Sequence, residues 1–215
     1  MKHFYILFVL FLLPSLAIAQ YAEYDWEERD TWMDPTEIFE KSNITKNSYV
    51  ADIGCHEGYL SIHLAKKVGK GGRVFAVDVR QDRLDELKNN YEDRALYNIE
   101  PILGDYDNPK LPEGKLDVVV IMDTYHEMND YMTILKHVKA ALKPGGRIVI
   151  IEKLKSRIRG KSRSAQMDAH SLGPKYVNRE LKKAGFRHVY QNNDMGDWEN
   201  DSDKVIWMTV AVKPK

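Results

Sequence analysis

Apolar and polar residues follow one another in blocks that predict β-strands and α-helices in turn. Short, nearly continuous apolar runs occupy residues 116–122 and 147–152, and such runs are typical of strands buried on both faces. Residues 80–91 have helical spacing instead, with Leu84 and Leu87 on one face. Alternation of buried strands with helices predicts an α/β fold with a doubly wound parallel sheet.

The same alternation extends over most of the chain. The other predicted strands are residues 49–53, 73–77, 99–103, 187–191 and 205–212, and the other predicted helices are residues 35–41, 58–68, 131–142 and 175–184. A polar turn region separates the last two strands, which predicts an antiparallel hairpin. We therefore expect a Rossmann-like α/β domain with a mostly parallel seven-stranded sheet and an antiparallel C-terminal hairpin, and no second domain.

The first residues have a different pattern. Lys2 precedes an apolar run at residues 4–13, and Ala17 and Ala19 are the small residues that a signal peptidase reads. The run is shorter than the roughly 20 residues that cross a bilayer comfortably. We expect residues 1–19 to be a cleaved signal peptide and the protein to be exported, to the periplasm. An uncleaved membrane anchor and a buried helix are the alternatives.

A helical lead-in is predicted between this signal and the main domain. Asp34 is the expected N-cap of the first helix, with Pro35 in its first turn and Glu37 completing a capping box. The predicted organisation is therefore a lead-in at residues 20–48, followed by the main domain at residues 49–215.

Charge and cysteine content exclude several classes of function. The chain has 32 basic and 32 acidic residues, whereas nucleic-acid binding needs a clustered basic excess, so we expect no nucleic-acid partner. Cys55 is the only cysteine, which rules out an internal disulfide. The spacing of cysteine, histidine and acidic residues suggests no metal site. The sequence does not specify the oligomeric state.

The turn after the first strand carries the most informative motif, D-x-G-x-x-x-G over residues 52–58. A dinucleotide site would need G-x-G-x-x-G here, but His56 and Tyr59 occupy two of the glycine positions that would follow Gly54. This difference argues against a nicotinamide or flavin cofactor.

The motif instead resembles motif I of the class I S-adenosylmethionine-dependent methyltransferases. The resemblance continues at Asp78, which closes the second strand, at residues 104–106 after the third, and in the L-K-P-G-G turn at residues 142–146. Residues 29–35 are similar to the lead-in of a group of exported bacterial methyltransferases. One position departs from the family, since His56 stands where the middle glycine is usual.

The resemblance implies S-adenosylmethionine as cofactor. In the family, an acid at the position of Asp78 binds the ribose hydroxyls and one near Asp105 lies by the adenine amine. Asp52 is expected to orient the loop or to meet the amino group through water. The implied cofactor-binding residues are Asp52, Gly54, Cys55, His56, Gly58, Asp78, Val79, Gly104, Asp105, Tyr106 and Asp123.

The segment after the fourth strand lies where this fold places the methyl acceptor. It is not an N-P-P-Y tetrad, and it offers Tyr125 and His126 as residues that deprotonate or orient a hydroxyl, thiol or amine. In the alternative interpretation these two residues merely open the loop. We expect methyl transfer to a small molecule; the rival functions are S-adenosylmethionine binding or sensing without turnover, and a nucleotide-binding oxidoreductase.

Two further features have open interpretations. A basic loop at residues 153–163 either recruits an anionic substrate or a membrane headgroup, or is simply a solvated face. His170, beyond this loop, is a candidate to face the pocket. Trp26 and Trp32 either cover the cofactor as a lid or pack the N-terminal helix on the core.

Overall fold

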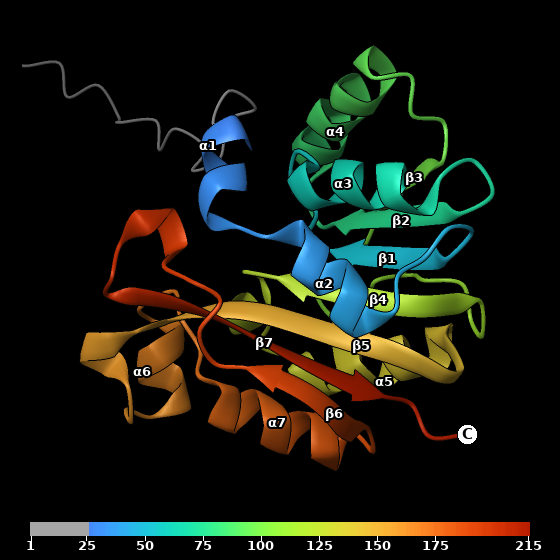
Figure 1. Cartoon of the computed structure of the whole chain (residues 1–215). Helices are drawn as coiled ribbons and strands as arrows, with labels where there is room; N and C mark the ends of the chain where they lie inside the picture. The colour runs from blue at the N-terminus through green and yellow to red at the C-terminus, as the bar shows by residue number, and fades with distance from the viewer. Residues whose placement is uncertain (1–25) are drawn as a thin grey trace, which may run out of the picture.

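A single seven-stranded sheet organises the protein, in the order β3-β2-β1-β4-β5-β7-β6 (Figure 1). The computed structural model describes residues 26–215, so the predicted signal peptide lies outside the described residues. The strands are β1 (Tyr49–Ile53), β2 (Arg73–Asp78), β3 (Ile99–Leu103), β4 (Leu116–Met122), β5 (Leu142–Lys155), β6 (Arg187–Asn192) and β7 (Lys204–Val212). Strands β1 to β5 pair in parallel, and β7 is antiparallel to both β5 and β6. The predicted doubly wound sheet with its antiparallel C-terminal hairpin is confirmed.

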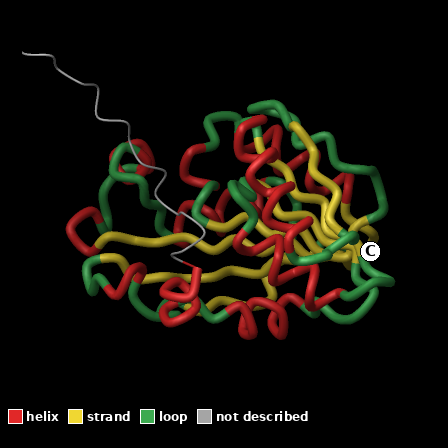
Figure 2. The backbone as a smooth tube through the Cα atoms, turned by 90° about the horizontal axis from the view of Figure 1, so that it is seen from above, coloured by secondary structure: helices red, strands yellow, loops and turns green. Residues whose placement is uncertain are grey.

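Helices cover both faces of this sheet (Figures 1 and 2). They are α1 (Trp26–Trp32), α2 (Pro35–Ser42), α3 (Tyr59–Val68), α4 (Gln81–Asp93), α5 (Tyr131–Ala141), α6 (Arg163–Met167) and α7 (Pro174–Lys183). The first four helices contribute to one apolar cluster, and α5 and α7 contribute to a second one. Because β1 lies between β2 and β4, the chain reverses its winding direction there. In such sheets the switch point opens a crevice at the carboxyl ends of the strands.

Residues 26–48, the part of the lead-in that the structure describes, are more ordered and more closely attached to the domain than their sequence pattern indicates. Helix α1 was not predicted, and Asp34 caps α2 as expected, accepting a hydrogen bond from the Thr36 amide at 2.8 Å. The predicted capping box is wrong, because the Glu37 carboxylate accepts hydrogen bonds from the Tyr190 hydroxyl and from the side-chain amide of Asn192, at 2.8 and 3.0 Å. Glu37 thus ties α2 to the edge strand β6.

The predicted basic loop at residues 153–163 is largely structured. Lys153 and Lys155 belong to β5, which is longer than expected because β7 pairs with it as far as Lys155. Ser156–Ile158 forms a short 3₁₀ helix, and Arg163 begins α6 and contacts Glu180 at 2.8 Å. The run of basic side chains in the sequence is therefore divided between the core and the surface.

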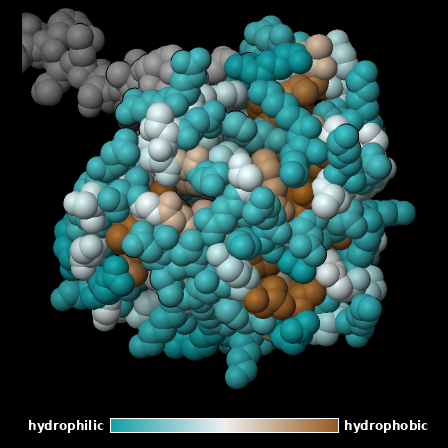
Figure 3. All heavy atoms as spheres, in the orientation of Figure 1, coloured by the Kyte–Doolittle hydropathy of each residue, from teal (hydrophilic) through white to brown (hydrophobic). Residues whose placement is uncertain are grey.

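The face of the molecule that Figure 3 shows is mainly polar. Figure 3 shows hydrophilic side chains over most of one face, with apolar side chains in small separate patches. Within residues 26–215, no helix has the length and apolar character needed to cross a membrane.

Candidate functional site

A cavity of about 680 Å³ lies at the carboxyl ends of β1, β2 and β4. This volume is within the range of roughly 300–1,000 Å³ that is usual for small-molecule sites. The sequence-predicted site residues that line it are Asp52, Gly54, Cys55, His56, Asp78, Val79, Asp105, Tyr106, Asp123 and His126. Three other predicted residues, Gly58, Gly104 and Tyr125, lie outside its lining.

The glycines of the β1 turn serve packing between neighbouring segments. A Cβ atom on Gly54, whose φ is 81°, would lie 2.3 Å from the hydroxyl oxygen of Thr124 in the loop after β4. A Cβ atom on Gly58, whose φ is 102°, would lie 2.2 Å from Leu87 of α4. Both positions combine a left-handed backbone with a close approach, and glycine alone satisfies both demands. The motif therefore holds the β1 loop against β4 and α4.

Asp78 at the end of β2 organises the loop that contains His56. One oxygen of the Asp78 carboxylate accepts a hydrogen bond from the His56 amide at 3.0 Å, and the other accepts one from the Arg80 amide at 3.0 Å. His56 has a φ of 50°, so it takes up the left-handed conformation that a glycine would adopt without strain. Its imidazole turns onto Glu57. Because a carboxylate has about four acceptor sites, Asp78 keeps capacity for ligand hydroxyls.

Asp52 at the end of β1 is a buried acid. It is only 2% exposed and accepts a hydrogen bond from the Ser61 hydroxyl at 2.7 Å. Burial raises the pKa of Asp52 to about 6, although the Ser61 hydrogen bond and the charge of Arg29 oppose this shift. A cationic ligand group beside Asp52 would favour its charged form.

Arg29 of α1 is a cavity residue that was not predicted. It is 7% exposed, and its guanidinium lies 4.1 Å from the Tyr59 ring centroid and 5.4 Å from that of Trp198. Its sequence signal is weak: a single arginine in a short aromatic and acidic segment. Only the packing of α1 brings it to the carboxyl end of β1.

Trp26 and Trp32 pack α1 onto the domain. The Trp26 indole donates a hydrogen bond to Glu57 at 3.1 Å, and the Trp32 ring lies 4.8 Å from that of Trp198. Neither tryptophan lines the cavity. The structure therefore favours the packing interpretation over the lid.

The loop after β3 forms a more open part of the cavity wall. Asp105 is exposed and contacts the Lys110 ammonium at 3.1 Å, and Tyr106 is also exposed. Gly104 brings this loop close to β2, because a Cβ atom there would lie 2.9 Å from Val77.

The two acceptor-site candidates, Tyr125 and His126, point in different directions from one 3₁₀ helix, η2 (Tyr125–Glu127). The Tyr125 hydroxyl donates to Glu180 of α7 at 3.0 Å, inside the second apolar cluster. Burial, followed by the charge of Glu180, raises the pKa of Tyr125. Tyr125 is therefore a core residue, and only His126 reaches the cavity.

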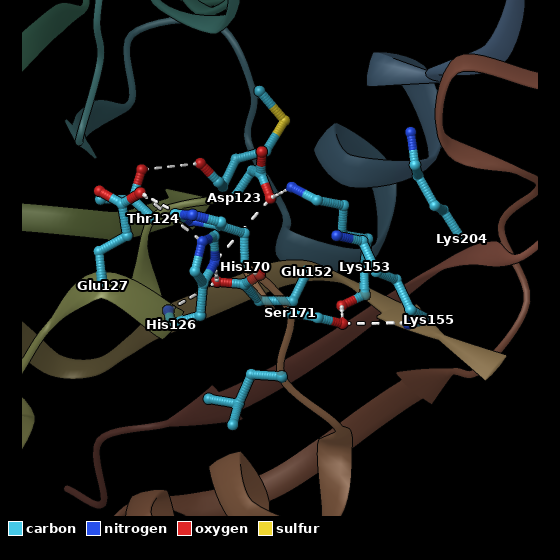
Figure 4. A network of polar contacts seen from close by, with 12 residues as sticks. Asp123, Thr124, His126, Glu127, Glu152, Lys153, Lys155, His170, Ser171 and Lys204 are labelled. Atoms are coloured by element: carbon cyan, nitrogen blue, oxygen red, sulfur yellow. Dashed lines mark hydrogen bonds and ion pairs between the residues drawn. The ribbon is translucent and has the colours of Figure 1, made fainter. Parts of the chain in front are cut away.

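His126 is held by Glu152, the residue near the end of β5 that the sequence interpretation missed (Figure 4). Glu152 accepts hydrogen bonds from the His126 amide and from its Nδ1 atom, both at 2.9 Å. Burial opposes the charged form of His126, but the carboxylates of Glu152 and Asp123 together outweigh burial, so the pKa of His126 is raised.

A partly buried ion pair lies beside this histidine. Lys153, which follows Glu152 on β5, contacts the Asp123 carboxylate, and both residues line the cavity (Figure 4). The sequence signal for Glu152 and Lys153 is two charges directly after the apolar run of β5.

Comparison with known sequences agrees with this geometry. A family model described as a methyltransferase domain matches residues 50–146. Demethylmenaquinone methyltransferase of Geobacillus sp. (strain WCH70) is 31% identical over 121 residues, which cover 56% of this chain and 51% of that protein. The chain spans about half the length of the curated relatives it matches.

Solved structures show the same fold. A S-adenosylmethionine-dependent methyltransferase from Aquifex aeolicus has a TM-score of 0.72 at 20% identity, covering 90% of this chain and 99% of that one. Phosphoethanolamine N-methyltransferase 2 from Haemonchus contortus, in complex with S-adenosyl-L-methionine, has a TM-score of 0.68 at 15% identity, covering 84% of this chain and 52% of that one. The motif, the sheet order and the match over residues 50–146 make the chain similar to S-adenosylmethionine-dependent methyltransferases, in sequence over that segment and in fold over most of its length.

Proposed function

We propose that the protein transfers the methyl group of S-adenosylmethionine to a small-molecule acceptor through an oxygen, nitrogen or sulfur nucleophile. The observation that carries this proposal is one cavity with acids at the ends of β1 and β2 and a held histidine after β4. The residues concerned are Asp52, Asp78 and His126. Each suits a different part of a methyl transfer.

The residues present fit the cofactor. Asp78 would accept hydrogen bonds from the ribose hydroxyls, and Asp105 would lie toward the adenine amine. Asp52, a buried carboxylate, suits the ammonium group of the methionine portion. Arg29, a buried cation of the cavity lining on the side of Asp52, would pair with the methionine carboxylate.

S-adenosylmethionine supplies an activated methyl group, so the protein chiefly has to align the acceptor and handle its proton. Glu152 fixes the Nδ1 side of His126, which leaves Nε2 for the acceptor. A carboxylate partner also makes the imidazole a stronger base. His126 would therefore hold the acceptor and receive its proton.

A methyl-transfer assay with labelled S-adenosylmethionine and a panel of hydroxyl, amine and thiol acceptors tests this proposal. Turnover that His126→Asn lowers while the affinity for S-adenosylhomocysteine stays unchanged supports it. Binding of S-adenosylhomocysteine without turnover on any acceptor would favour the rival binding or sensing module. Binding of a nicotinamide instead would favour an oxidoreductase.

We also propose that the protein is exported, on the basis of the signal-like pattern of residues 1–19. Cell fractionation with N-terminal sequencing tests this proposal. A mature chain that begins at Gln20 outside the cytoplasm is the expected result, and an intact N-terminus in the cytoplasm would contradict it.

A further inference from the structure

Two histidines and one glutamate converge at the acceptor end of the cavity (Figure 4). His126 and Glu127 come from η2, and His170 comes from the segment between α6 and α7. The Oε1 atom of Glu127 lies 3.7 Å from Nε2 of His126 and 3.7 Å from Nδ1 of His170. One ligand atom from each residue lies within 4.8 Å of the others.

This spacing is close to that of a metal site. Ligand atoms at about 2.1 Å from a tetrahedral Zn²⁺ ion are roughly 3.4 Å apart. The two glutamate–histidine distances, each 3.7 Å, need only a small closure. The side chains of His170 and Glu127 are 72% and 62% exposed, so they are free to turn toward an ion.

The third ligand, His126, is already held as a metal ligand requires. Its Nδ1 atom lies 2.9 Å from the Glu152 carboxylate, which is fully buried. A carboxylate on one ring nitrogen fixes the tautomer and directs the other nitrogen to the metal. Glu152 thus leaves the Nε2 atom of His126 available on the side of Glu127.

A second group, formed by Asp123, His126 and Glu152, is as compact but less suitable. Lys153 contacts Asp123, so a cation there would meet an ammonium group. Glu152 already accepts two hydrogen bonds from His126. The group with Glu127 and His170 has neither obstacle.

We propose that His126, Glu127 and His170 bind a divalent transition-metal ion, with Zn²⁺ as the best match for two imidazoles and a carboxylate. Three protein ligands leave a position open, as in catalytic zinc sites. This position faces the cavity, where the acceptor of the proposed methyl transfer would bind.

A bound metal ion would restrict the methyl acceptor to hydroxyls and thiols. This restriction rests on the proposed methyltransferase function. A hydroxyl or thiol bound to the ion loses its proton to solvent, because the cation lowers its pKa. Its electron pair then forms the bond to the methyl carbon while the carbon–sulfur bond of the sulfonium breaks, and neutral S-adenosylhomocysteine leaves. His126 would hold the ion instead of acting as the base. The acceptor group is therefore a hydroxyl or a thiol that can bind the metal ion and lose its proton.

Calorimetric titration of ZnCl₂ into untagged, chelator-treated protein tests the metal site. One saturable site is expected in the wild type, and Co²⁺ should give the visible spectrum of a tetrahedral complex. Glu127→Gln and His170→Gln should weaken binding by at least about tenfold. His188→Gln, a change of the same kind at an exposed position on β6, should leave binding unchanged.

Absence of Zn²⁺ binding in the folded wild type would overturn the metal site. Equal Zn²⁺ affinities for His170→Gln and His188→Gln would overturn it too, and circular dichroism would show whether each variant is folded. S-adenosylhomocysteine binding, measured on the same samples, separates the two proposals. Zn²⁺ binding without S-adenosylhomocysteine binding contradicts only the methyltransferase proposal. S-adenosylhomocysteine binding without Zn²⁺ binding contradicts only the metal site.

Discussion

The Nδ1 atom of His126 lies 2.9 Å from the Oε2 atom of Glu152, which is fully buried at the end of β5. The same carboxylate accepts a hydrogen bond from the His126 amide, so both the ring and its backbone are fixed. This pair connects the strand β5 to the loop after β4. It determines which nitrogen of His126 faces the cavity.

Removing the charge of Glu152 is expected to weaken the function of His126 without changing the cofactor site. Glu152→Gln keeps a hydrogen-bond acceptor but loses the carboxylate, and loss of such a supporting group costs roughly 10–100-fold in activity or metal affinity. We expect this fall in kcat and in Zn²⁺ affinity, with KM for S-adenosylmethionine unchanged. Steady-state kinetics and calorimetry provide the measurement.

Tyr125→Phe is the matched comparison for Glu152→Gln. The Tyr125 hydroxyl faces Glu180 in the core, so its loss should leave kcat within about twofold while costing about 1 kcal/mol of stability. A large loss of kcat with normal stability would show that Tyr125 reaches the acceptor.

Replacing Arg29 by methionine is expected to reveal what its charge binds. Methionine keeps the apolar contact with Tyr59, but a charge-assisted hydrogen bond is worth about 1.5–3 kcal/mol, or roughly 10–100-fold in affinity. S-adenosylhomocysteine should bind that much more weakly. Methylthioadenosine, which has no methionine carboxylate, should bind with unchanged affinity in the same titration.

The control for Arg29→Met is Arg94→Met. The Arg94 guanidinium also lies over an aromatic ring, at 5.1 Å from the Trp26 centroid, but Arg94 does not line the cavity. Equal losses for both ligands in Arg29→Met would indicate a purely structural role for Arg29.

Replacing Gly54 by alanine is expected to disturb the contact between the β1 and β4 loops. Gly54 and Gly114 both have a left-handed φ. A Cβ atom on Gly54 would meet the Thr124 side chain, whereas a Cβ atom on Gly114 would face open space. Gly54→Ala should therefore cost about 1–3 kcal/mol more than Gly114→Ala. Urea unfolding measures both, and equal costs would show that the loop yields to the methyl group.

Burial of Asp52 should make stability depend on pH. Its folded pKa of about 6 lies above the unfolded value near 3.8, so the folded protein holds the proton more tightly. The stabilising contribution is complete below the unfolded pKa and is lost as pH rises toward 6. The two-unit difference corresponds to about 3 kcal/mol.

Urea unfolding of the ligand-free protein between pH 4 and pH 7 measures this effect. Wild-type stability relative to Asp52→Asn should fall across this interval, whereas its stability relative to the exposed variant Asp107→Asn should not show the same fall. A constant difference from Asp52→Asn would show that Asp52 is not protonated in the folded protein at pH 4.

The sequence pattern predicted the strands and the acids at their ends because both depend on local order. Asp52 and Asp78 follow apolar runs directly, and parallel strands bring their carboxyl ends together. Arg29 was not predicted, because it reaches the cavity only through the packing of α1. Glu152 was missed because its contact with His126 depends on tertiary placement, whereas His170 was named as a candidate to face the pocket and does line the cavity.

Local geometry explains the error at Tyr125. Adjacent residues of a 3₁₀ helix point about 120° apart, so Tyr125 and His126 cannot face the same pocket. The pattern of apolar and polar residues does not distinguish which of the two turns inward. Lys153 and Lys155 were predicted to lie in a loop, but they belong to β5. Pairing with β7 extends this strand beyond its apolar run, and the sequence pattern does not show that pairing.

The cofactor site itself is tested most directly by titrating S-adenosylhomocysteine into the purified protein by calorimetry, with Asp78→Asn and Asp107→Asn beside the wild type. Asp107 is exposed and lies outside the cavity lining, so it serves as the matched control. We expect saturable binding at one site in the wild type and in Asp107→Asn, and a loss of at least about tenfold in Asp78→Asn. Absence of binding in the folded wild type, or equal affinities for the two variants, would contradict the proposed cofactor site.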